Sequence, residues 1–163
     1  MAKEIAILAG GCFWGVEEIL RKIPGVLDTE VGYCGGEKVR PFYEDIKKGN
    51  TNHAEAVKIE FDNSQLSFES LLDYFFRLHD PTTLNRQGND MGTQYRSAIF
   101  CQTPEQHQVA EKKKKMVEQL GRFPKPIVTQ ITNVLPFYSA EVDHQDYLQK
   151  NPNGYNCHIL LKN

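Results

Sequence analysis

The chain has 163 residues, of which 40% are hydrophobic and 25% are charged, and its formal net charge at pH 7 is -2. This length suits one domain with a sizeable core, and no linker-like stretch divides it, so we expect a single domain over residues 1–163. The nearly balanced charge disfavours nucleic acid or an anionic membrane as the main partner. No apolar run approaches the roughly 20 residues of a membrane span, so we expect a soluble cytoplasmic protein.

The first predicted element is a buried strand over residues 4–9, which form a short apolar run. Gly10 and Gly11 then allow a tight turn. A helix is predicted after the turn, because four apolar residues recur at helical spacing before Pro24 and Gly25 end the pattern: Val16, Ile19, Leu20 and Ile23.

Cys12 therefore stands where a strand is followed by a helix. Unpaired amides and the helix dipole favour a negative charge at that end of a helix, so we expect the pKa of this thiol to be lowered and the thiol to be reactive. The alternative is that Cys12 is a small buried hydrophobe and that its neighbours Phe13 and Trp14 belong to the core.

The next elements are a strand over 26–33, a long polar loop over 37–53 that carries Tyr43, and a strand over 55–61. In the second strand Val57, Ile59 and Phe61 share one face, and Glu55 has the same parity. A carboxyl group on a buried face has a raised pKa. The alternative is that the strand starts one residue later and that Glu55 is an ordinary solvated acid.

Ser67 is predicted to cap a helix that ends near His79-Asp80-Pro81. The polar loop over 80–94 is long for a connection inside a compact domain, and such loops are often functional. The remaining predictions are a strand over 95–101, a helix opened by Thr103-Pro104-Glu105, a strand over 127–134, a short helix over 144–150 and an irregular C-terminal tail from about residue 151.

The predicted order of elements is β-α-β-β-α-β, followed by α-β. This order is the split β-α-β pattern of a ferredoxin-like fold. We therefore expect an α+β protein, a ferredoxin-like two-layer α/β sandwich with a C-terminal extension.

The four cysteines, at positions 12, 34, 101 and 157, lie far apart and form no C-x-x-C pair, which disfavours a zinc knuckle and, in a reducing compartment, a structural disulfide framework. Two kinds of chemistry remain open for Cys12. Acyl or peptide-bond chemistry needs one of the five histidines as its base. Thiol redox chemistry passes through a sulfenic acid that a second cysteine converts to a disulfide, and Cys157 on the tail is the best-placed second cysteine.

Several motifs of this sequence together resemble the A-type peptide-methionine sulfoxide reductases, in register from about Ala6 to Cys157. They are Gly11-Cys12-Phe13-Trp14-Gly15 with Glu17, Gly32-Tyr33 with Gly35-Gly36, His53-Ala54-Glu55, His79-Asp80-Pro81-Thr82, Asn85-Arg86-Gln87-Gly88, Asp90, Gln94-Tyr95-Arg96-Ser97 and Asn151-Pro152-Asn153-Gly154-Tyr155.

This resemblance implies reduction of methionine S-sulfoxide, free or in proteins, as a repair of oxidised proteins. It also implies thioredoxin as the electron donor and no metal or organic cofactor. The roles it implies for single residues are a nucleophile at Cys12, an acid at Glu55, hydrogen bonds to the sulfoxide oxygen from Tyr43 and Tyr95, an ordering carboxylate at Asp90, methyl-binding aromatics at Phe13 and Trp14, and a resolving cysteine at Cys157.

Three positions depart from the family pattern. Asn52 stands where a glycine is usual, which we expect to alter only a turn, and Asn156 separates Tyr155 from Cys157. Cys34 stands where alanine is more frequent, in a glycine cluster that is a candidate part of the same site, so it competes with Cys157 as the resolving cysteine. The competing functional class is a binder or sensor of oxidised methionine, which needs the pocket but no proton donor at Glu55.

Overall fold

The strand β1 (Lys3–Gly10) is paired on both sides, to β3 (Ala54–Asp62) and to β6 (Ser97–Cys101). Its side chains alternate between two buried faces, with Leu8 in one cluster and Ile7 in the other. The structure is a computed structural model, and it describes residues 2–161. Because both faces of β1 are covered, the end of this strand is a rigid base for the turn that carries Cys12.

Six strands form a mixed sheet in the order β7-β6-β1-β3-β2-β8. Together with the helices that cover it, this sheet gives the chain an α+β fold. Strand β2 (Val26–Cys34) pairs with β3 and with β8 (Phe137–Ser139), both antiparallel. Strand β7 (Gln130–Asn133) is parallel to β6 at the opposite edge.

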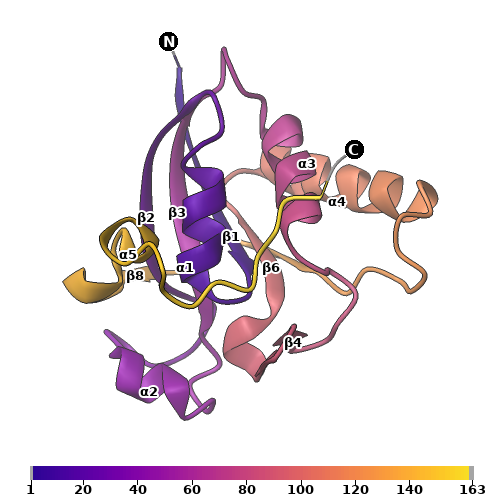
Figure 1. Cartoon of the computed structure of the whole chain (residues 1–163). Coiled ribbons are helices and arrows are strands. Elements are labelled where there is room, and N and C mark those ends of the chain that lie inside the picture. Colours follow the sequence, from indigo (N-terminus) through magenta and orange to yellow (C-terminus); the bar gives the residue numbers. More distant parts are fainter. Residues whose placement is uncertain (1, 162–163) are drawn as a thin grey trace.

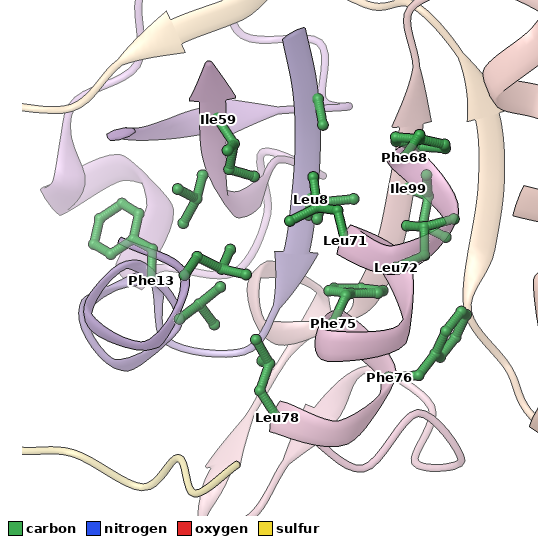
Figure 2. Packing of buried hydrophobic residues seen from close by; sticks show 14 of the residues in the cluster. Leu8, Phe13, Ile59, Phe68, Leu71, Leu72, Phe75, Phe76, Leu78 and Ile99 are labelled. Carbon is green, nitrogen blue, oxygen red and sulfur yellow. The ribbon is translucent and has the colours of Figure 1, made fainter. Parts of the chain in front are cut away.

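Helices α1 (Phe13–Leu20) and α3 (Phe68–Leu78) lie against one face of this sheet, and α4 (Pro104–Gln119) packs beside α3 (Figure 1). The larger core lies between the helices and the sheet, where Leu8 and Ile59 from the strands meet the apolar faces of α1 and α3 (Figure 2). The other face carries a smaller cluster of small side chains and one large ring: Ile7, Ala9, Cys34, Ala54, Ala56, Ala98 and Phe100.

The predicted helix starts are confirmed by their caps. The Ser67 hydroxyl accepts a hydrogen bond from the backbone of Ser70 over 3.0 Å, and the Thr103 hydroxyl accepts one from Gln106 over 3.1 Å. Pro104 occupies the first position of α4, where its missing N–H is not needed.

Both predicted loops contain short elements that the sequence pattern did not reveal. The 37–53 loop holds α2 (Tyr43–Lys47), and the 80–94 loop holds the hairpin of β4 (Arg86–Gln87) and β5 (Asp90–Met91). The strand predicted over 95–101 begins at residue 97, because residues 93–95 form the 3₁₀ helix η1 (Thr93–Tyr95), which a bond from the Tyr95 amide to the Gly92 carbonyl closes over 3.0 Å.

The helix predicted over 144–150 is divided into the 3₁₀ helix η2 (Val142–His144) and α5 (Tyr147–Lys150). The break falls at Asp146, whose φ of 55° is left-handed and cannot continue a helix. Strand β8 was not predicted.

The tail beyond α5 is irregular, as predicted, and runs past the start of α1 towards α3 (Figure 1). Two hydrogen bonds hold its end. The Leu161 amide donates to the Arg77 carbonyl over 2.8 Å, and the Arg77 guanidinium donates to the Leu161 carbonyl over 2.9 Å. Within residues 2–161, no helix is both long and apolar enough to cross a bilayer.

Candidate active site

Cys12 is the N-cap residue of α1, and Phe13 is the first residue of that helix, as the sequence predicts. The turn before it depends on Gly11, whose φ of +99° is disfavoured for any residue with a Cβ. The Cys12 side chain is only 8% exposed. The thiol therefore lies at the bottom of the site rather than on the surface.

Glu55 lies on β3 and is 2% exposed, so its predicted place on the buried face is confirmed and the solvated alternative is wrong. Its Oε1 accepts a hydrogen bond from the backbone amide of Phe13 over 3.1 Å, which brings the carboxyl group next to the residue that follows Cys12. Burial raises the pKa of Glu55 to about 8, and Asp90 adds to this rise while the Phe13 amide opposes it. At neutral pH the side chain is therefore mainly a carboxylic acid, which can donate a proton.

The expected lowering of the Cys12 pKa is wrong for the free protein. Burial, and after it the nearby Glu55, raise the pKa of this thiol, and only the backbone at Trp14 acts in the opposite direction. A helix terminus stabilises a nearby negative charge by about 0.3–1 kcal/mol at an exposed position, which is less than one pKa unit. Desolvation of a buried charge shifts a pKa by up to several units in the opposite direction. Cys12 rests as a neutral thiol.

Tyr43 and Tyr95 come from two separate elements, the start of α2 and the end of η1, and both phenols are half-buried. Burial raises the pKa of each phenol, followed by the charge of Glu55, with further contributions from Cys12 and Asp90. Groups that shift one another in this way lie within electrostatic reach. The structure thus gathers these five predicted site residues, and both phenols stay protonated hydrogen-bond donors.

Asp90 connects this group to the C-terminal tail. Both of its carboxylate oxygens accept hydrogen bonds from the Tyr155 hydroxyl, each over 3.1 Å, and the Cys157 thiol lies 3.7 Å from Oδ2. The charge of Cys157 is also one of those that raise the pKa of Cys12. The tail therefore brings Cys157 to the same site as Cys12.

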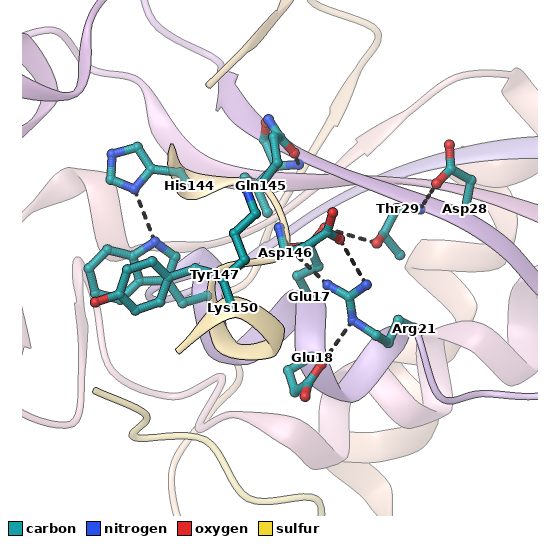
Figure 3. Close-up of polar contacts among 12 residues, drawn as sticks. Glu17, Glu18, Arg21, Asp28, Thr29, His144, Gln145, Asp146, Tyr147 and Lys150 are labelled. Carbon is teal, nitrogen blue, oxygen red and sulfur yellow. Dashed lines mark hydrogen bonds and ion pairs between the residues drawn. The ribbon is translucent and has the colours of Figure 1, made fainter. Parts of the chain in front are cut away.

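The two aromatic residues after Cys12 lie differently. Phe13 is fully buried, and its ring centre is 5.8 Å from that of Tyr33. Trp14 is half-buried and stacks on Tyr147, with ring centres 3.8 Å apart. Its indole N–H donates to Nδ1 of His144 over 3.0 Å (Figure 3).

The segment 141–150 is the part of the site that sequence reasoning missed. Glu141 accepts a hydrogen bond from the Tyr33 hydroxyl and another from the Tyr43 amide, each over 2.8 Å. These bonds hold the start of α2, and with it Tyr43, against the sheet. The charged and aromatic residues of this segment were the available signal, but no spacing pattern connected them to Cys12.

A partly buried ion-pair cluster connects the same segment to α1 (Figure 3). Glu17 is 1% exposed and accepts a hydrogen bond from the Asp146 backbone over 3.0 Å. Arg21 pairs with both carboxylates, at 3.2 Å from Glu17 and 2.8 Å from Asp146. The cluster explains why Asp146 keeps its left-handed backbone, and it positions the rings of His144 and Tyr147 against Trp14.

Cys34 does not line the site, so its suggested place near Cys12 is wrong. It alternates with Tyr33 along β2 and belongs to the small cluster on the opposite face of the sheet. It is fully buried, and burial raises the pKa of its thiol to about 12. Asn52, by contrast, behaves as expected, since its φ of 61° is the left-handed turn conformation in which glycine is usual.

The histidines give no support to acyl chemistry at Cys12. Within residues 2–161, the hydrogen bonds of the five imidazole rings go to other partners and none goes to the Cys12 thiol. A cysteine nucleophile of that class needs a base within hydrogen-bond reach. The neutral Cys12 thiol and the protonated Glu55 carboxyl group instead suit a reaction in which the thiol attacks an electrophile while the carboxyl group protonates that electrophile.

Comparison with known proteins identifies the family. The model of the family described as peptide methionine sulfoxide reductase matches residues 4–163. The chain belongs to the peptide methionine sulfoxide reductase family. This reductase is 50% identical over 153 residues to MsrA of Nocardia farcinica, covering 94% of this chain and 88% of that protein. It is 48% identical to MsrA 1 of Mesorhizobium japonicum, covering 96% and 89%.

Solved structures agree with this family. Mxr1 from Saccharomyces cerevisiae in reduced form has a TM-score of 0.89 and 37% identity to this reductase, covering 98% of this chain and 93% of that one. MsrA of Corynebacterium diphtheriae has a TM-score of 0.84 and 38% identity, covering 96% and 78%. Mxr1 in complex with Trx2 has a TM-score of 0.64 and 26% identity, covering 98% and 91%.

Proposed function

We propose that this chain reduces methionine S-sulfoxide, free or in proteins, with Cys12 as the nucleophile and Glu55 as the acid. The observation that carries the proposal is the buried Glu55 carboxyl group beside the Phe13 amide, with its pKa raised to about 8. A protein that only binds oxidised methionine needs a pocket but no buried proton donor. The family to which the chain belongs supports the same substrate.

The first step joins the Cys12 sulfur to the sulfoxide sulfur. Glu55 donates its proton to the sulfoxide oxygen, which makes the sulfur more electrophilic, and the carboxylate that results accepts the proton of the Cys12 thiol. In the adduct the hydroxyl group then migrates to Cys12: an S–O bond to the Cys12 sulfur forms while the S–O bond to the substrate sulfur and the bond between the two sulfurs break. Cys12 is left as a sulfenic acid and methionine leaves, its sulfur reduced as the Cys12 sulfur is oxidised. Because both groups are neutral before substrate binds, the free site avoids burying two negative charges.

The two phenols and the two aromatic residues supply selectivity. Tyr43 and Tyr95 donate hydrogen bonds to the sulfoxide oxygen, and these bonds strengthen as negative charge develops there. Phe13 and Trp14 form the apolar slot for the methyl group, with Trp14 at its surface and the buried Phe13 beneath it, and the Tyr147 ring stacked on the indole keeps that surface in place. One fixed oxygen position and one apolar methyl slot accept a single epimer of the sulfoxide.

The enzyme is then regenerated through a disulfide. Cys157 attacks the sulfenic acid of Cys12, water leaves, and thioredoxin reduces the disulfide by thiol exchange. The complex of the similar protein Mxr1 with Trx2 supports thioredoxin as the donor. Asp90, which holds both Tyr155 and Cys157, orders the pocket and releases the tail when the disulfide forms.

Two further assignments belong to the same proposal. The inner strand order β6-β1-β3-β2 with α1 and α3 on one face supports a ferredoxin-like two-layer sandwich, in one catalytic domain over residues 1–163. Dependence on thioredoxin suits the cytoplasm, where thiols are kept reduced.

The test is turnover of a methionine sulfoxide peptide, first with dithiothreitol and then with thioredoxin. We expect the S epimer to be reduced with both donors and the R epimer with neither. Cys12→Ser should abolish reduction even with excess dithiothreitol. Residual activity of Cys12→Ser within a few-fold of the wild type would assign the chemistry to another cysteine.

A further inference from the structure

The imidazole of His158 lies between the turn that carries Cys12 and the Cys157 thiol of the proposed reaction. Its Nε2 is 2.7 Å from the carbonyl oxygen of Gly10, two residues before Cys12, and its Nδ1 is 3.7 Å from the Cys157 sulfur. The ring is buried, with 6% of the residue exposed. A Cβ on Gly15 would lie 2.5 Å from Nδ1, so this glycine leaves the space that the ring occupies. The ring is therefore held in one orientation.

The bond to Gly10 determines which nitrogen of His158 carries the hydrogen. A carbonyl oxygen only accepts, so Nε2 must be the donor in that bond. In a neutral imidazole the other nitrogen, Nδ1, then holds a free lone pair. This lone pair lies 3.7 Å from the Cys157 sulfur and can accept the thiol proton, for which Oδ2 of Asp90, at the same distance, is the alternative acceptor.

We propose that His158 is the general base for Cys157 in the resolving step. The proposal rests on the proposed function, because it requires Cys157 to be the cysteine that attacks the sulfenic acid. The Cys157 proton moves to Nδ1 while the Cys157 sulfur bonds to the Cys12 sulfur and the S–O bond of the sulfenic acid breaks. The imidazolium then gives its proton to the departing hydroxide, which leaves as water. The sulfenic sulfur is reduced as the Cys157 sulfur is oxidised, so no other reductant takes part.

Cys157 needs such a base. Although Cys157 is an exposed residue, the protein around its sulfur partly desolvates the thiol and raises its pKa, and Asp90 adds to the rise while Tyr155 opposes it. Burial lowers the pKa of His158, while the Gly10 carbonyl and the Asp90 charge act in the opposite direction, so the ring is mainly neutral at pH 7. A neutral imidazole beside a protonated thiol is the arrangement in which general-base catalysis operates.

The other acceptor near the thiol is Asp90. Its Oδ2 is also 3.7 Å from the Cys157 sulfur, but both of its oxygens already accept from the Tyr155 hydroxyl. Carboxylates are weaker bases than imidazoles as a class. Another titratable group beside His158 is His79, a buried ring whose pKa is lowered to about 3, mainly by burial, so it stays neutral. His158 is thus the stronger base in contact with the thiol.

His158→Gln tests the assignment. The glutamine amide N–H can replace Nε2 as the donor to Gly10, but no basic nitrogen remains at the position of Nδ1. His107→Gln on α4, whose ring bonds Asn133 far from both cysteines, is the matched control. The enzyme is mixed with one equivalent of methionine sulfoxide peptide, and free thiols are labelled at successive times to follow the Cys12–Cys157 disulfide. At pH 7 we expect disulfide formation to slow about 10²-fold in His158→Gln and to be unchanged in His107→Gln.

The pH profile separates a base from a structural role. In the wild type the rate of disulfide formation should fall about tenfold per pH unit below the pKa of His158 and be level above it. In His158→Gln the rate should instead rise continuously with hydroxide, because solvent must deprotonate a thiol whose pKa is raised, so that high pH partly rescues the variant. The wild-type profile gives this test even if the variant does not fold.

Three outcomes would overturn the proposal: a wild-type rate of disulfide formation in His158→Gln, an equal deficit in this variant at every pH, or a wild-type profile without a level region. The parent proposal fails separately. If Cys157→Ser retains turnover with thioredoxin, the resolving cysteine is misassigned. If Cys157→Ser loses this turnover and His158→Gln keeps it, only the base is wrong.

Discussion

The backbone amide of Phe13 donates a hydrogen bond to Oε1 of Glu55 over 3.1 Å. This bond connects the first residue of α1 to the buried face of β3, so the helix that presents the nucleophile also fixes the acid. When Oε1 is occupied by an N–H donor, the proton of the neutral acid belongs on Oε2, the oxygen left for the substrate. Preorganisation of this kind avoids reorienting the acid during the reaction.

Glu55→Gln should therefore reduce the rate of sulfoxide reduction by on the order of 10²–10⁴, because the amide keeps the bond to Phe13 but donates no proton. In the wild type, kcat/KM should decrease as the pH rises through about 8, where Glu55 loses its proton. The measurement is steady-state turnover with dithiothreitol across this range. Glu60→Gln, on the same strand but paired with Lys3 at the surface, is the control and should retain wild-type turnover. An unchanged rate in Glu55→Gln at neutral pH would remove Glu55 from the mechanism.

The same buried acid makes the stability of the fold depend on pH. Burial raises the pKa of Glu55 from 4.5 to about 8, so between these values the folded state keeps a proton that the unfolded state loses. The contribution of Glu55 to the free energy of unfolding is therefore largest below pH 4.5. It decreases as the pH rises to about 8, by at most about 1.4 kcal/mol per pH unit. Urea unfolding at several pH values should show this slope in the wild type relative to Glu55→Gln. A stability difference that does not vary with pH would contradict it.

The local sequence pattern was sufficient to predict those site residues whose position is determined by a single strand or by the start of a single helix. The strand–glycine–cysteine–helix order places Cys12, and strand parity places Glu55 on the buried face. Tyr43 and Asp90 lie in short elements inside apparent loops, and Tyr95 lies where such a loop meets a predicted strand. Periodicity carries no signal there, so only the family resemblance indicated these three residues.

The rest could not be predicted because it depends on contacts between distant residues. His144 meets Trp14 across 130 positions of the chain, and His158 meets Gly10 across 148. The pKa of Cys12 was predicted in the wrong direction for the same reason. The helix terminus is visible in the sequence, but the burial that outweighs it results from the packing of β3 and the tail around the thiol.

Gly15 should be needed for the packing of the C-terminal tail against α1 rather than for the chemistry of Cys12. A Cβ at this position would lie 2.5 Å from Oδ1 of Asn156 and 2.5 Å from Nδ1 of His158. Gly15→Ala raises helix propensity by about 1 kcal/mol but displaces the tail. We expect the first methionine to be released while Cys12–Cys157 disulfide formation slows, as followed by thiol labelling. Lys22→Ala, just past the end of the same helix and exposed, should change neither. Disulfide formation at the wild-type rate in Gly15→Ala would show that the tail tolerates this displacement.

The two candidate resolving cysteines are separated by the sheet, which makes their roles testable with matched variants. Cys157 is exposed and contacts Asp90 within the site, whereas Cys34 is fully buried on the opposite face, where its thiol lies 3.7 Å from the Leu135 carbonyl. Cys157→Ser should release about one methionine per enzyme and then stop with thioredoxin, because the sulfenic acid has no partner thiol. Cys34→Ser should retain most of its turnover, since the serine hydroxyl can donate to the same carbonyl.

Dithiothreitol should partly rescue Cys157→Ser, because a small thiol reaches the sulfenic acid directly, whereas thioredoxin requires a disulfide. The tail is anchored beyond Cys157 by Arg77 and Leu161, so only the segment between Tyr155 and His158 has to move when the two sulfurs join. Peptide mapping after one equivalent of substrate then identifies the bond, and we expect Cys12 linked to Cys157. A dominant Cys12–Cys34 disulfide in the wild type would require the sheet to open and would reverse the assignment, and a Cys34–Cys157 species would indicate a relay through both.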